Sequence, residues 1–108
     1  MFLFVSRYLI PKGFSGLSIY PFVVVSDRKY RENGIFINHE KIHIRQQIEM
    51  LVLPFFIWYV LEYFVRLIQY KNRNLAYRNI SFEREAYKNE SDLHYLKTRR
   101  FWTFLHYL

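Results

Sequence analysis

The sequence predicts a small α+β domain that is mainly helical, with three to four helices and a small β-sheet beside the helix that carries a pair of histidines. Three observations predict this class. The chain has 108 residues, which suits one domain over residues 1–108. Its hydrophobic fraction of 52% and aromatic fraction of 21% exclude a disordered chain. One β-branched segment before residue 26 is followed by three segments with helical patterns.

The segment LSIYPFVVV, residues 17–25, is β-branched and aromatic and predicts one strand. Pro21 within it has no backbone N–H, so we expect this strand at an edge of the sheet. Residues 1–10 are apolar and predict either a strand or a short helix. A polar turn that stops at Gly34 separates these segments from the helices.

Three helices are predicted after that turn. The first runs from about residue 35 to residue 53, and Pro54 suits the first turn of the second. A third helix opens after Ser81, which stands in the N-cap position. The aromatic segment 95–108 most simply completes the core as a terminal helix. Contact with a membrane surface, a plug over a cleft, or a homodimer stays open for this segment.

The second helix, to about residue 70, is strongly apolar, and its simplest role is to fill the core. Its longest apolar run, residues 50–61, is shorter than the ~20 residues that span a bilayer. Glu62 ends this run and is expected to pair with Arg66 on a solvated face, rather than to support a functional site. The N-terminus lacks the features of a signal peptide. We therefore expect a cytoplasmic protein, with a membrane-peripheral position left open.

The chain carries a formal net charge of +7, which favours anionic partners. Its basic residues are scattered rather than gathered in a block, so we expect no specific nucleic-acid partner. The absence of cysteine excludes disulfide bonds and thiolate metal sites.

The most informative segment is NHEKIH, residues 38–43, which contains the pattern HExxH. On a helix, His39 and His43 lie one turn apart and roughly 40° apart around the axis, so both imidazoles can bind one ion. Glu40 is rotated roughly 100° from His39, beside the ion rather than on it. From there its carboxylate can take a proton from a water molecule. The spacing predicts a zinc site, provided that a third ligand exists.

Three glutamates are candidates for this third ligand. Glu49 lies roughly 240° around the helix from His43 and faces away. Glu83 and Glu85 are two residues apart in the segment FEREAY, so they point to nearly opposite sides of a helix. Glu83 shares its face with Ala86, a small residue that lets a neighbouring helix approach. We therefore expect Glu83 to complete the site and Glu85 to face solvent or form a salt bridge.

NHEKIH followed by FEREAY resembles the gluzincin zinc metallopeptidases. The similarity is greatest to the catalytic cores of integral-membrane metallopeptidases such as the CAAX type, and to the small soluble minigluzincins. It covers roughly residues 17–90, and its specific part is these two motifs. The resemblance implies that His39, His43 and Glu83 bind Zn²⁺ and that Glu40 is the general base.

One position departs from the pattern of the membrane enzymes, which have Asp where this chain has Tyr87. In those enzymes the Asp usually orients a metal-binding histidine, so the support of that histidine is open here. Tyr87, His94 and Tyr77 are the candidates for orienting a ligand or for binding an oxyanion. The residues alone do not choose among these three side chains.

The resulting hypothesis is a zinc-dependent metallopeptidase that cleaves peptide bonds with a metal-activated water, in an active or a latent form. A peptide or protein substrate would pair with the strand at residues 17–25 as an added strand. The alternative is a non-enzymatic membrane-peripheral or partner-binding module in which HExxH is structural or degenerate. Nucleic-acid binding rests on charge alone and ranks last.

Overall fold

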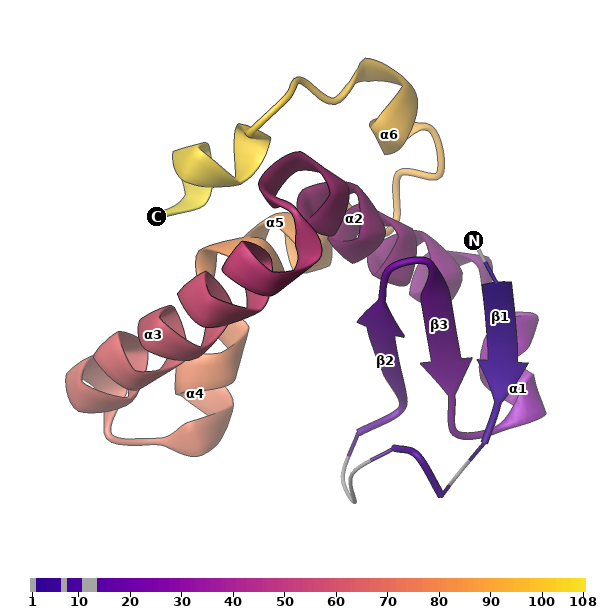
Figure 1. Ribbon diagram of the computed structural model, residues 1–108, viewed down its shortest axis with the longest axis horizontal. Coiled ribbons are helices and arrows are strands. Elements are labelled where there is room, and N and C mark those ends of the chain that lie inside the picture. The colour runs from indigo at the N-terminus through magenta and orange to yellow at the C-terminus, as the bar shows by residue number, and fades with distance from the viewer. Residues whose placement is uncertain (1, 7, 11–13) are drawn as a thin grey trace.

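The computed structural model describes residues 2–6, 8–10 and 14–108 and confirms the predicted α+β class. Within these residues it contains a three-stranded sheet, six α-helices, two of which are single turns, and one 3₁₀-helix, η1. The elements in chain order are β1 (Phe2–Val5), β2 (Gly16–Ile19), β3 (Phe22–Val25), α1 (Arg28–Arg31), α2 (Gly34–Met50), α3 (Val52–Tyr70), α4 (Arg73–Arg78), α5 (Ser81–Asn89), α6 (Tyr95–Thr98) and η1 (Thr103–Tyr107). Helix α2 packs against β2, α3 and α5 and so connects the two halves of the molecule (Figure 1).

The segment 17–25 forms two strands rather than one, and the expected edge position is wrong for its second half. Strand β3 is the central strand, parallel to β1 and antiparallel to β2. Pro21 lies in the two-residue turn between β2 and β3, where its missing N–H removes no ladder hydrogen bond. Val23 and Val25 of β3 point inward and pack with Ile44 of α2, which fixes the sheet against that helix.

The boundary between α2 and α3 lies three residues before Pro54. Leu51 has a positive φ of 64°, which ends α2, and α3 begins at Val52. Pro54 therefore lies in the first turn of α3, where no intrahelical bond to its nitrogen is needed. The predicted N-cap of α5 is also wrong, because Ile80 holds that position. Ser81 is the first helical residue.

Helix α3 fills the core as predicted, but with one side only, through Phe55 and the partly buried aromatic residues that pack beside it. Of its nineteen residues only Phe55 and Glu62 are buried. Glu62 pairs with Arg66 at 3.4 Å as predicted, but not on a solvated face. Its carboxylate is buried and also accepts hydrogen bonds from the Ser81 backbone N–H and, at 2.6 Å, from the Ser81 hydroxyl. A carboxylate at the start of α5 is stabilised by the partial positive charge of the helix N-terminus. By length and apolar composition, α3 is the one helix in the described residues that could cross a bilayer.

The C-terminal segment completes the core, as its simplest interpretation predicted. Phe104 of η1 is fully buried and packs against Phe82 of α5, and the segment lies across the top of α2 and α5 (Figure 1). Arg99 is buried and forms ion pairs with Glu85 and Glu49. Glu85 is therefore in a buried salt bridge and does not face solvent.

Candidate metal centre

Helix α2 and helix α5 bring the two sequence motifs together. The Asn33 side chain caps the N-terminus of α2 by accepting from the Phe36 backbone N–H. Asn38, the fifth residue of α2, donates to the backbone carbonyls of Glu90 and Asp92, both at 2.9 Å. These bonds fix the end of α5 against α2, so that the next residue on α2, His39, faces the α5 side chains.

The structure brings His39, His43 and Glu83 into one buried cluster. The Nε2 atoms of the two histidines are 3.2 Å apart, and Glu83 Oε1 lies 3.2 Å from His39 Nε2 and 3.0 Å from His43 Nε2. Three atoms bonded to one ion at about 2.0–2.1 Å and at tetrahedral angles would lie about 3.3 Å from one another. The distances between the three donor atoms therefore already match those of a tetrahedral zinc site, and the backbones of α2 and α5 need not move to bind the ion.

The outer nitrogens of both imidazoles are occupied, which leaves the inner nitrogens for an ion. His39 Nδ1 lies 2.7 Å from the Glu90 carboxylate, which can only accept. His43 Nδ1 lies 2.8 Å from Gln46 Oε1. Gln46 has this orientation because its Nε2 donates to the Phe82 carbonyl and to the Glu85 carboxylate. Both Nδ1 atoms therefore donate, and in the neutral form of each imidazole, the form that binds a metal, the Nε2 lone pair points at the cluster.

Glu83 is held by a hydrogen bond that selects one of its oxygens. The Tyr59 hydroxyl donates to Glu83 Oε2 at 2.6 Å, so Oε1 is left facing the two histidines. Burial would raise the pKa of Glu83, but His43 and His39 hold it well below its usual range. Burial would lower the pKa of His43, but Glu83 raises it to about 9. The cluster therefore stabilises positive charge at its centre, whether this is a proton or a metal cation.

Glu40 lies beside this cluster and is 7% exposed. Burial raises the pKa of its carboxyl, against the lowering effects of His43 and His39 and of a hydrogen bond with Ser18 on β2. A raised pKa makes the carboxylate a stronger base than an ordinary glutamate. The position on α2 is the one expected for a group that takes a proton next to the cluster and does not ligate.

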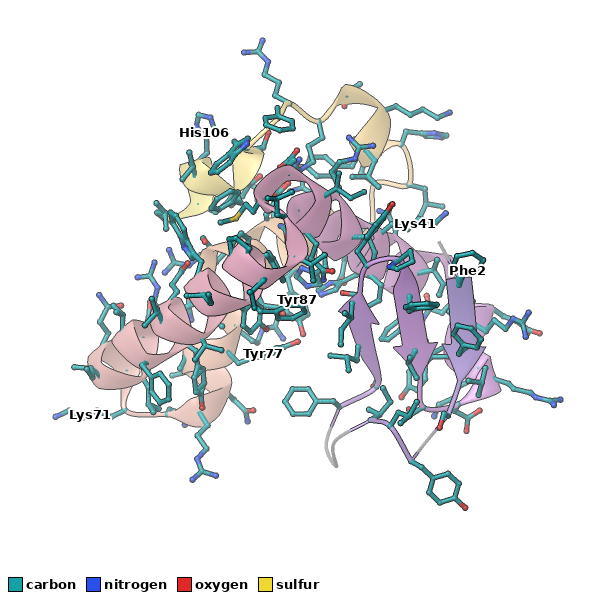
Figure 2. The ribbon with its side chains drawn as sticks, viewed as in Figure 1. Phe2, Lys41, Lys71, Tyr77, Tyr87 and His106 are labelled. Carbon is teal, nitrogen blue, oxygen red and sulfur yellow. The ribbon has the colours of Figure 1, made fainter. Side chains whose placement is uncertain are left out.

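Of the three additional candidates, two lie beside the cluster. The Tyr87 ring packs edge-on against His39, with centroids 4.5 Å apart, and the Tyr87 hydroxyl is 3.4 Å from that of Tyr77. Figure 2 shows both tyrosines in the space between α4 and β2. Burial and the charge of Glu83 raise the pKa of Tyr77, so it stays a hydrogen-bond donor at neutral pH. His94 is exposed in the turn before α6 and is not part of the cluster.

The edge of β2 nearest α2 is already in use. Gln47 of α2 donates to the Ser18 carbonyl at 2.8 Å and accepts from the Tyr20 backbone N–H at 2.6 Å. The amide of Gln47 thus takes the hydrogen bonds that the peptide of an added strand would make. A substrate strand that paired with this part of β2 would have to displace the Gln47 side chain.

Three residues that support the cluster were not predicted from the sequence. Glu90 orients His39, the role that the sequence left open when Tyr87 replaced the Asp of the membrane enzymes. The sequence signal for this role was the position of Glu90 on the same helical face as Glu83. Gln46 follows His43 by three residues, a spacing that lets two helical side chains meet. Tyr59 could not be predicted, because nothing in the sequence places α3, which carries Tyr59, beside α5, which carries Glu83.

Comparison with protein-family models, with curated proteins and with solved structures gave no match for this chain. The resemblance to gluzincins therefore stays a prediction from the two motifs. The case for a metal site rests on the distances, the proton positions and the burial of the cluster itself.

Loss of the carboxylate behind His39 should weaken metal binding without removing it. We expect Glu90→Ala to lower zinc affinity by about 10–100-fold, the usual effect of losing a group that orients a ligand. Glu90→Gln keeps an oxygen that can accept from His39 Nδ1, so it should retain most of the wild-type affinity. Competition with a chromogenic zinc chelator measures both. Equal losses in the two variants would show that Glu90 does not act through this hydrogen bond.

Proposed function

We propose that this protein is a zinc metallopeptidase of the gluzincin type, with His39, His43 and Glu83 as metal ligands and Glu40 as general base. The observation that carries the proposal is the triangle of His39 Nε2, His43 Nε2 and Glu83 Oε1, with 3.0–3.2 Å sides. Three nitrogen and oxygen ligands with no thiolate are the donor set of catalytic rather than structural zinc sites. A zinc ion bound there would acidify a water molecule and polarise a peptide carbonyl.

The side chains around the cluster have separate roles in this proposal. Glu40 takes a proton from water and later gives it to the leaving amine. Glu90 and Gln46 hold the imidazoles in one tautomer, and Tyr59 holds the Glu83 carboxylate. Tyr77 is the favoured donor to the oxygen on which negative charge develops, because the Tyr87 hydroxyl donates to Tyr77 and leaves the Tyr77 proton for another acceptor.

The conformation described here is closed to a peptide, which supports a latent form of the enzyme. His39, His43, Glu40 and Glu83 are each at most 7% exposed. The surface hollows beside Asp27 and beside Lys41 and Leu93 do not reach the cluster. Gln47 also occupies part of the β2 edge. Substrate binding therefore requires movement of β2 or of the tyrosines that cover the cluster.

The general base gives the sharpest test of this function. We expect Glu40→Gln to keep one zinc per chain and to lower peptide cleavage by about 10²–10⁴-fold, because general-base catalysis contributes this much. The assay is cleavage of a mixture of unstructured peptides by the zinc-loaded protein, read by mass spectrometry. Lys41→Gln is the control, since Lys41 is the exposed neighbour on α2 and should leave cleavage unchanged. Cleavage that persists in Glu40→Gln would contradict the assigned role.

The second candidate is a module in which a bound metal ion only stabilises the fold. The burial of the cluster favours it, because a closed site needs no access for substrate. In this case the protein binds zinc and gains stability, but no peptide in the mixture is cleaved, even when Gln47→Ala frees the β2 edge that a latent enzyme keeps covered. The two candidates thus share the metal site and differ in turnover.

A further inference from the structure

Helix α3 presents a continuous apolar surface that no part of the described chain covers. We call this surface the α3 outer face. Its exposed fractions range from 50% at Val60 to 76% at Ile68. It consists of Leu53, Ile57, Val60, Leu61, Phe64, Val65 and Ile68.

These seven residues follow helical spacing, since each is three or four positions from another. They therefore form one stripe along α3, a helix of about 28 Å at 1.5 Å per residue. The opposite side of α3 carries the packed residues, with Phe55 and Trp58 against Phe82 and with Glu62 at the start of α5. The helix is thus anchored through one side and apolar on the other, and an apolar surface of this extent marks an interaction site.

The charges around α3 indicate what covers this face. Residues 51–79 contain four basic residues and one acidic residue, Glu62, which is buried. Lys71 caps the end of α3, and Arg73 begins α4, which packs beside α3 (Figure 2 labels Lys71). Both are exposed, whereas Arg78 stacks on the Tyr87 ring of α5 and Arg66 pairs with Glu62.

The same imbalance holds for the whole described surface. Five of the nine acidic residues are buried, in the metal cluster, beside Arg99 or at the start of α5. Among the lysines and arginines of the described residues, Arg99 alone is buried. The charge that faces solvent is therefore more positive than the net charge of +7 indicates.

We propose that the α3 outer face docks on an anionic lipid bilayer, with α3 lying in the plane of the membrane surface. An apolar helical stripe flanked by basic residues fits both the acyl region and the negative head groups of such a surface. A second copy of the chain fits less well, because it would bring two sets of uncompensated basic residues together. This inference does not depend on the metal site.

Flotation of the full chain with lipid vesicles tests the proposal. We expect the protein to float with vesicles of phosphatidylcholine and phosphatidylserine, and to bind much less to phosphatidylcholine alone or in high salt. The triple variant Leu61→Gln, Phe64→Gln and Ile68→Gln should bind the anionic vesicles at least about ten-fold more weakly than the wild type. These positions are exposed, so circular dichroism and the urea unfolding midpoint should match the wild type and show that the variant is folded.

A matched variant separates this face from other apolar surface. Phe2→Thr with Phe4→Thr removes two exposed rings from the outer side of the sheet and should leave flotation unchanged. Loss of binding in the sheet variant but not in the α3 variant would overturn the proposal. The proposal would also be overturned if the wild-type protein did not bind anionic vesicles and was a dimer by light scattering, while the α3 variant was a monomer. A second copy of the chain would then cover the α3 outer face.

Discussion

Glu83→Gln is expected to abolish zinc binding at the proposed metal centre. Glu83 is the proposed ligand that α5 brings to the two histidines of α2, and its Oε1 atom lies within 3.2 Å of both Nε2 atoms. The amide of glutamine has nearly the same shape but no negative charge, so the fold is kept while the ligand is lost. Zinc affinity should fall by more than the ~10–100-fold caused by loss of an orienting group. Elemental analysis after equilibration against a weak chelator measures the loss.

The control for this variant is a glutamate outside the cluster. Glu85 is unsuitable, because its side chain is buried against Arg99 and its removal would disturb the core. Glu32 is exposed at the end of α1, and Glu32→Gln should bind as much zinc as the wild type. A Glu83→Gln protein that keeps one tightly bound zinc would place the metal elsewhere.

Arg99→Met is expected to cause the largest loss of stability. The guanidinium of Arg99 is fully buried and pairs with the carboxylates of Glu85 and Glu49, which are buried too. Removing the cation leaves two buried carboxylates without a partner, and breaking such a pair costs about 3–5 kcal/mol. Urea unfolding of the metal-free protein, followed by tryptophan fluorescence, measures the free energy of unfolding. Metal-free protein is needed because bound zinc would add its own stabilisation.

Two further variants define the cause of this loss. Arg100→Met changes the exposed neighbour and should shift the unfolding free energy by less than about 0.5 kcal/mol. Adding Glu85→Gln and Glu49→Gln to Arg99→Met removes the unpaired charges and should restore a large part of the stability. An Arg99→Met protein within about 1 kcal/mol of the wild type would show that the network is not critical to the fold.

The fold class and the cluster were accessible from the sequence because both follow from periodicity. The spacing of His39 and His43 places them on one side of a helix wherever that helix lies. The face shared by Glu83 and Ala86 distinguishes Glu83 from Glu85 in the same way. Such arguments need only the geometry of one element, and the structure brings these residues together.

The errors arose where the outcome depends on contacts between elements. Glu62 pairs with Arg66 as its spacing predicts, but the pair is not on a solvated face, because α5 approaches and the Glu62 carboxylate also caps Ser81. An apolar helix such as α3 is normally buried on all sides, and only the structure shows that no part of the described chain covers its outer face. Pro21 has no backbone N–H and so cannot donate within a central strand. Both an edge strand and a turn satisfy this constraint, and in the structure Pro21 lies in a turn.

The most direct test of the metal centre is the position of zinc in crystals of the protein, read from anomalous diffraction at the zinc edge. The proposal predicts one peak about 2.0–2.1 Å from His39 Nε2, His43 Nε2 and Glu83 Oε1. The chain's other two histidines, His94 and His106, are exposed and offer sites for adventitious zinc. Peaks at these surface histidines alone, with none between α2 and α5 at saturating zinc, would contradict the metal centre and the peptidase function that depends on it.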